Sequence, residues 1–300
     1  MGLLLVAGAG LLLLLTQPAM AISLAGTLDL FLARSGTPGR WRSLVRRGML
    51  SSPVPEAIAP GMDASFRRLV QEGPVPEPSR DFLINGWRWH TQAVLRDLHR
   101  FIALAQSLSS DDSRDGSSSR AVLLQRCHAF VCGFSWRALM TIEGEIFFPW
   151  LADLLPSDVA KPLIGRLFQQ HSEIRAMTSR LETLCRRCGS REELGEVVSC
   201  LEDLVARARA MQQVQEEVFV PFIAAYVSRR EQERFNSMVL SKLGIVDANV
   251  HLVSMFDAVR GSPAEMSKFN KQIPRVVQAL IPLWRRRLYS PRAKFLDPQA

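Results

Sequence analysis

The stretch "MTIEGEIFFPWL", residues 140–151, has a counterpart 72 residues further along the chain, "QQVQEEVFVPFI", residues 212–223. In both stretches acidic or amide side chains precede a dense apolar run that contains a proline, Pro149 in the first and Pro221 in the second. A charge is costly to bury unless it is paired, so carboxylates placed twice beside such runs need an explanation. They predict helices that enclose polar groups. Each helix should bend or end at its proline, because proline lacks a backbone N–H.

The sequence on both sides of these stretches has the periodicity of amphipathic helices. In "RDFLINGWRWHTQAVLRDLHRFIALAQSL", residues 80–108, apolar side chains recur at steps of three or four. The same pattern predicts further helices over 120–155, 161–188, 191–226 and 228–244, and shorter ones from Val246 onward. Alternating strand patterns are scarce. The predicted fold class is therefore all-α, an up-down four-helix bundle with additional C-terminal helices.

The first 28 residues contain no charged side chain, and residues 3–15, "LLLVAGAGLLLLL", form an apolar core. This core is shorter than the ~20 residues of a transmembrane helix, and Ala19–Ala21 resembles a signal-cleavage site. Three interpretations stay open: a cleaved signal sequence, a signal anchor with residues 34–47 on the cytoplasmic side, and the first part of an organelle-targeting leader. We expect the protein in the secretory pathway or an organelle, with membrane anchoring as an alternative.

Composition divides the remainder of the chain. Residues 29–77 are rich in Pro, Gly, Ser and Arg and are expected to form a disordered linker between the leader, 1–28, and the bundle, 78–244. Residues 245–300 are expected to form a C-terminal helical extension. Its last helix, "IPRVVQALIPLWRRRLY" at 273–289, is apolar on one face and basic on the other, so it is expected either to cap the bundle or to rest on a membrane.

The charge and the cysteines limit the classes of function. The chain is basic, with 37 Lys and Arg against 29 Asp and Glu, and its basic runs lie at 40–47 and 284–294. No basic stripe alternates with aromatic residues in the middle, so we expect no nucleic-acid partner, whereas the basic ends suit an anionic membrane surface better. The five cysteines all fall in helical patterns, and no strand precedes the "CRRC" of residues 185–188. Buried free thiols are therefore expected rather than a disulfide framework or a redox motif.

Three polar residues fall on the predicted inward faces of three different helices. A lone inward histidine is more often a hydrogen-bonded core residue than a ligand. Two imidazoles and a carboxylate on facing helices are, however, what non-haem iron or manganese requires. These candidate metal ligands are His90, Glu143 and His171.

The order of these features resembles the hemerythrin-like, or HHE cation-binding, domains. "GWRWH" and "RDLHRF" lie in the first helix, "EGEIFFPWL" ends the second, a lone His followed by Ile lies in the third, and "QEEVFVPFI" ends the fourth. The resemblance covers residues 79–243. It implies a four-helix bundle around a bridged di-iron centre, with one His from each of the first and third helices and an H-x-x-x-E pair from each of the others. Members bind oxygen, sense iron or redox state, or handle iron and nitric oxide.

The chain departs from this pattern at the ligands. The family places a His ten residues before each proline and a Glu six before it. Counted back from the two prolines, these positions hold Leu139 with Glu143 and Met211 with Gln215. Both expected histidines are therefore apolar residues, and one expected glutamate is an amide.

A register shifted by two residues would restore carboxylates at Glu145 and Glu217, but no histidine. The candidates that could join the surviving ligands are Glu145, Glu216 and Glu217. Such a set predicts one non-haem iron ion rather than two, and no cofactor if the site is vestigial. Two functions stay open: a binding or sensing protein for iron or another metal, and a metal-free structural or membrane-associated bundle that acts through protein contacts. Nothing in the sequence indicates a substrate pocket, so an enzyme is the less favoured expectation, and no protein partner can be named.

Overall fold

The computed structural model describes residues 82–110, 117–155 and 157–296. The leader predicted at 1–28 and the linker predicted at 29–77 lie outside the described residues. Every regular element in the described ranges is helical and none of them is a strand, which confirms the all-α class.

Four long helical segments follow one another along the chain. The first is α5 (Asn85–Ser110), and the third is α9 (Ser157–Arg187). The second joins α6 (Ser117–Phe130), η2 (Val131–Trp136), α7 (Arg137–Ile142), η3 (Glu143–Phe147) and α8 (Phe148–Leu154). The fourth joins α10 (Arg191–Val214), η4 (Gln215–Phe219) and α11 (Val220–Tyr226).

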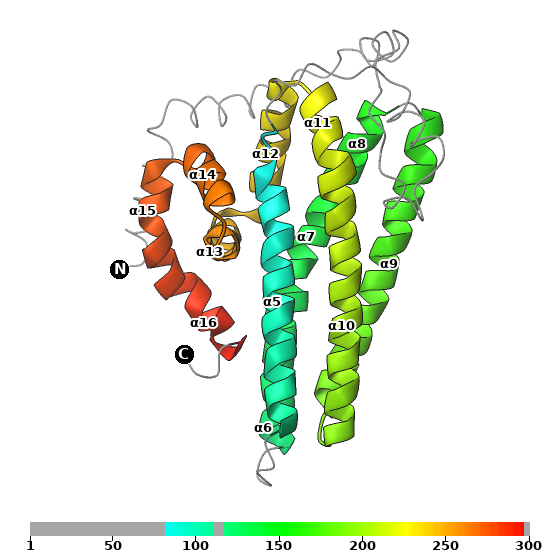
Figure 1. Cartoon of the computed structure of the whole chain (residues 1–300), viewed down its shortest axis with the longest axis vertical. Helices are drawn as coiled ribbons and strands as arrows, with labels where there is room; N and C mark the ends of the chain where they lie inside the picture. Colours follow the sequence, from blue (N-terminus) through cyan, green and yellow to red (C-terminus); the bar gives the residue numbers. More distant parts are fainter. Residues whose placement is uncertain (1–81, 111–116, 156, 297–300) are drawn as a thin grey trace. The chain divides into compact units, whose positions relative to one another are not determined.

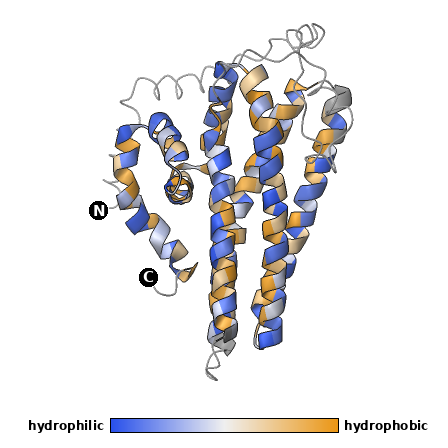
Figure 2. Cartoon of the chain, in the orientation of Figure 1, coloured by the Kyte–Doolittle hydropathy of each residue, from blue (hydrophilic) through white to orange (hydrophobic). Residues whose placement is uncertain are grey.

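The four segments lie side by side, and successive segments run in opposite directions (Figure 1). Helix α10 packs against α5 and α9, α6 packs against α9, and η2 contacts α5. Each long helix carries both hydrophilic and hydrophobic residues along its length (Figure 2). The inward positions are fully buried, as at Leu98, Phe101, Leu124, Leu181 and Leu201. Burial of these apolar side chains drives the association of the segments.

The two quoted stretches form turns of π-helix, η3 and η4, each placed just before its proline. In an α-helix a proline ring clashes with the carbonyl four residues earlier. At η3 the Phe148 N–H bonds to the Glu143 carbonyl, and at η4 the Val220 N–H bonds to the Gln215 carbonyl, each five residues back. We attribute the wider turns to the prolines, because one extra residue moves the obstructing carbonyl aside. The helices therefore continue through Pro149 and Pro221 instead of ending there.

The chain after Tyr226 forms shorter helices. They are α12 (Arg229–Leu243), α13 (Ile245–Val259), α14 (Pro263–Gln272), α15 (Arg275–Trp284), η5 (Arg285–Tyr289), α16 (Ser290–Ala293) and the 3₁₀ turn η6 (Lys294–Leu296). Between α12 and α13 the chain turns at Gly244, whose φ of 70° is a backbone conformation that favours glycine. This bend coincides with the predicted boundary between bundle and extension. Helix α13 nevertheless packs along α5, and all described residues belong to one compact unit.

None of the described helices is, by itself, long and apolar enough to cross a membrane. The bent pair α12 and α13, with 115° between its two helices, passes that test by length and composition when taken together.

Candidate functional site

Glu143 is the centre of a buried hydrogen-bond cluster that joins all four long segments. Glu143 is the first residue of η3, and it is 1% exposed. Carboxylate Oε1 accepts from Trp87 Nε1 at 3.1 Å and from Gln215 Nε2 at 3.0 Å, and Oε2 accepts from His171 Nε2 at 2.9 Å. These donors lie on α5, η4 and α9, so one carboxylate accepts a hydrogen bond from each of the other three segments.

The cluster brings the two related stretches into direct contact. Glu143 and Gln215 are the first residues of η3 and η4, and both are buried. Because a carboxylate only accepts and an amide nitrogen only donates, the pair bonds without a second buried charge. The aromatic residues that follow also meet, with ring centroids of Phe147 and Phe219 separated by 5.4 Å and those of Trp87 and Phe147 by 4.2 Å. The polar cluster is therefore flanked by a layer of packed, buried aromatic rings.

His171 is held on one side only. Its Nε2–H donates to Glu143, because a carboxylate can only accept, while Nδ1 has no hydrogen-bond partner among the described residues. The ring packs on Phe148 at a centroid distance of 4.7 Å. Gly144 leaves room beside it, since a Cβ built there would lie 3.7 Å from Nδ1. Two of the three predicted ligands, His171 and Glu143, thus form a hydrogen-bonded pair.

His90, the third predicted ligand, belongs to a different buried cluster. Its ring lies against the ring of His251, with centroids 4.5 Å apart, and it hydrogen-bonds to the backbone of Ser135. Burial lowers its pKa to about 4, although the Ser135 hydrogen bond opposes this effect. Nε2 of His90 finds no partner in the described part of the chain.

His251, which stands outside the predicted ligand set, is buried beside His90. The side chain is 1% exposed on α13, stacked on Phe134 at a centroid distance of 4.4 Å with 4° between the planes. Burial lowers its pKa well below the usual value, and the neighbouring His90 and Arg292 add to the effect. The periodicity could have indicated this, since the apolar Ala248 and Met255, at i−3 and i+4, lie on the same helix face as His251.

The three additional glutamates lie away from Glu143. Glu145 is exposed and pairs with Lys242, and Glu217 is exposed and accepts from Gln213. Glu216 forms a bidentate ion pair with Arg88, in which Nη2 lies 2.7 Å from Oε2 and Nε lies 2.8 Å from Oε1. The shifted register therefore places its carboxylates on the surface.

The residues present do not fit the metal centre that the resemblance implies. Among the described residues no group of three His, Cys, Asp or Glu side chains is arranged to hold a metal ion. Both oxygens of Glu143 already accept hydrogen bonds, and His90 packs on His251. Leu139, at the position of an expected histidine, is 3% exposed and adds apolar volume instead.

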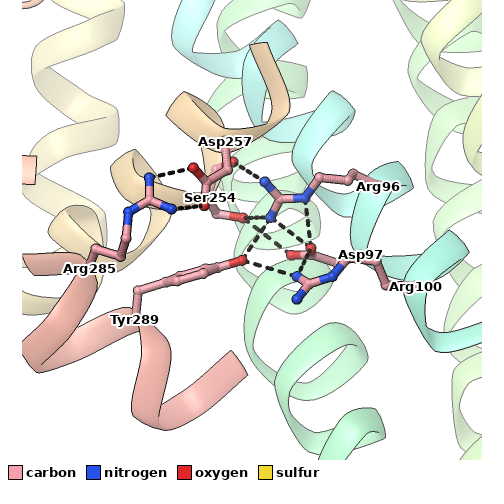
Figure 3. Close-up of polar contacts among 7 residues, drawn as sticks. All are labelled: Arg96, Asp97, Arg100, Ser254, Asp257, Arg285 and Tyr289. Carbon is pink, nitrogen blue, oxygen red and sulfur yellow. Dashed lines mark hydrogen bonds and ion pairs between the residues drawn. The ribbon is translucent and has the colours of Figure 1, made fainter. Parts of the chain in front are cut away.

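A second polar network ties the C-terminal helices to α5 (Figure 3). Asp97, fully buried, accepts from Arg96 at 2.7 Å, from Arg100 at 3.1 Å and from the Ser254 hydroxyl at 3.2 Å. The Tyr289 hydroxyl accepts from Arg96 at 2.8 Å. Burial alone would lower the pKa of Arg96, but Asp97, Tyr289 and Asp257 together outweigh it and raise that pKa. Arg96 also donates to the Ser254 backbone carbonyl at 3.0 Å, and Arg285 and Asp257 extend the network toward the surface.

The cysteines are buried free thiols, as the sequence predicts. Burial raises the pKa of Cys127 and of Cys185 to about 12. A thiol that stays protonated is a poor nucleophile and a poor ligand, so these cysteines have the character of core residues.

Comparisons with protein families, curated proteins and solved structures find no match to this chain.

Proposed function

We propose that this chain is a metal-independent helical scaffold, an up-down four-helix bundle of hemerythrin-like design that acts through contacts at its surface and not as an enzyme. The observation that carries the proposal is the set of hydrogen bonds that Glu143 accepts. Its carboxylate accepts hydrogen bonds from Trp87, His171 and Gln215. The polar side chains at the centre of the four segments are therefore bonded to one another.

Hydrogen bonds of this kind can replace a metal as the interior link between helices. A buried carboxylate with three donors is compensated for its lost hydration. An ion entering here would have to displace donors that the carboxylate already holds, and it would gain few ligands, because Leu139 offers none and Glu145 is exposed. The proline positions and the meeting of Glu143 with Gln215 support the hemerythrin-like design.

The test is metal analysis of the full chain after expression in iron-supplemented medium and purification without chelators. We expect substoichiometric iron, manganese and zinc, and no rise in the thermal midpoint when ferrous or zinc ions are added, because a ligand that binds only the folded state must raise it. The matched control is Glu143→Gln, which should contain as little metal as the native chain. Stoichiometric iron with near-ultraviolet oxo-to-iron absorption, lost in Glu143→Gln, would contradict the proposal.

The second candidate is the binding or sensing of a single iron ion by His90, Glu143 and His171. It is favoured by the ring nitrogens Nδ1 of His171 and Nε2 of His90, which are buried and find no partner in the described ranges. It requires His90 to leave its contact with His251. The same metal analysis decides between the two functions.

A further inference from the structure

Helix α15 carries an apolar stripe on the side that faces away from the protein. Val276 and Leu283 are each 40% exposed, and Ala279 between them is also exposed. Positions i, i+3 and i+7 lie on one face of a helix, so the three form a continuous stripe. On the opposite face Ile281 is 3% exposed, and α15 packs on α13. Helix α15 is therefore apolar on both faces, whereas a helix at a water-exposed surface is normally polar on the outer one.

Arginines bracket this stripe at both ends. Arg275 begins α15, and Arg286 and Arg287 follow its last turn; all three are exposed. No carboxylate in the described part of the chain pairs with any of them. The described residues from 245 to 296 contain nine Lys and Arg against three Asp and Glu.

The three acidic residues of this region are already paired. Asp247 pairs with Arg292, Asp257 with Arg285, and Glu265 with Lys268. The outer face of α15 and η5, defined by Val276, Ala279, Leu283, Arg275, Arg286 and Arg287, therefore has a positive charge that this region does not neutralise.

We propose that this face binds an anionic phospholipid surface, with the helix parallel to the bilayer. In an interfacial helix an apolar stripe enters the headgroup region, and flanking arginines contact the lipid phosphates. The outer face of α15 and η5 has this pattern. A nucleic acid would also attract the arginines, but its phosphate backbone offers nothing to Val276 and Leu283. The inference rests on the proposed scaffold function and names the partner of its surface.

The test is co-sedimentation of the full chain with vesicles of phosphatidylcholine alone and with vesicles that also contain phosphatidylserine. The variants are Arg286→Glu/Arg287→Glu and, for the apolar stripe, Leu283→Ser. The control is Arg175→Glu/Arg180→Glu, two exposed arginines of α9, which changes the net charge equally on the other side of the molecule (Figure 1). Circular dichroism verifies that each variant is folded.

We expect the native chain to prefer the anionic vesicles, and this preference to fall about tenfold or more in Arg286→Glu/Arg287→Glu, because each arginine near the surface contributes to attraction and each glutamate repels. Binding to neutral vesicles should not change, which separates this face from any contribution of the apolar N-terminus. Leu283→Ser should weaken binding several-fold, and the α9 control should bind like the native chain.

The proposal is overturned if the native chain does not distinguish the two vesicles, or if the α9 control loses as much binding as the α15 variant. It is also overturned if duplex DNA displaces the vesicles while Leu283→Ser binds as well as the native chain. If vesicle binding fails these criteria but the purified chain contains substoichiometric metal, only the membrane proposal is contradicted. If the chain binds anionic vesicles selectively but contains stoichiometric iron, only the scaffold function is contradicted.

Discussion

A carboxylate that accepts three hydrogen bonds in a dry interior is costly to remove, and Glu143 accepts them from Trp87, Gln215 and His171. Truncation leaves these donors buried without an acceptor, which costs more than the bonds contribute net. We predict that Glu143→Ala lowers the free energy of unfolding by about 3–5 kcal/mol.

Glu145, two residues away on the same turn, provides the control. It is exposed, and its partner Lys242 is also exposed, so Glu145→Ala should change the free energy of unfolding by less than about 1 kcal/mol. Urea unfolding of both variants, followed by circular dichroism, measures the difference. Equal losses from the two substitutions would show that the interior cluster contributes no more than a surface ion pair.

The buried pair His90 and His251 should make stability depend on pH. Burial lowers the pKa of His90 to about 4 and that of His251 well below its usual value. The unfolded chain binds these protons from about pH 6.5 downward and the folded chain does not, so stability is complete above pH 6.5 and falls as pH decreases toward 4. His90 alone contributes on the order of 3 kcal/mol across this interval.

The measurement is the urea midpoint of the native chain between pH 7.5 and about pH 5, above the range in which ordinary carboxylates titrate. We expect the midpoint to fall with pH, and to fall less in His251→Phe, which removes one buried imidazole and keeps an aromatic ring against Phe134. A native midpoint that is constant over this interval would show that the two rings are hydrated or already charged in the folded protein.

At the scale of the elements, hydrophobic periodicity predicted the long helices to within a few residues, because an inward stripe must recur every three or four positions. It also showed that the prolines interrupt regular helix. It did not predict that the interruption takes the form of π turns, since that depends on whether the helix beyond the proline has a core to pack against. Here it does, through Leu151 after Pro149 and Phe222 after Pro221, which are 0% and 4% exposed.

The candidate site was predicted in part. Counting from the prolines made Glu143 and Gln215 equivalent, and these two residues do meet. The helix faces also placed His171 near them correctly, but they could not show which partner His90 would take. That partner, His251, comes from α13, and the packing of α13 on α5 follows from long-range contacts that no local pattern contains.

For the whole molecule, the question is whether the C-terminal helices form a separate domain, as the predicted boundary at 244 and 245 implies. The Asp97 network argues for one cooperative unit, because it joins α5 to Ser254 and Tyr289 in the protein interior (Figure 3). A second buried contact, Trp89 with Phe269 at 5.1 Å between ring centroids, joins α5 to α14. Contacts of this kind couple the unfolding of the two parts.

We predict that Asp97→Ala lowers the free energy of unfolding by about 3–5 kcal/mol, because it leaves Arg96 and Arg100 without the carboxylate that they share. The surface control Asp247→Ala, whose partner is the exposed Arg292, should cost less than about 1 kcal/mol. Both should unfold in a single transition, with tryptophan fluorescence and far-ultraviolet circular dichroism giving the same midpoint. If Asp97→Ala instead separates the signal into two transitions, the network is the link that holds two independently stable parts together. If it costs no more than Asp247→Ala, the apolar contacts of α13, α14 and α15 hold the extension in place without it.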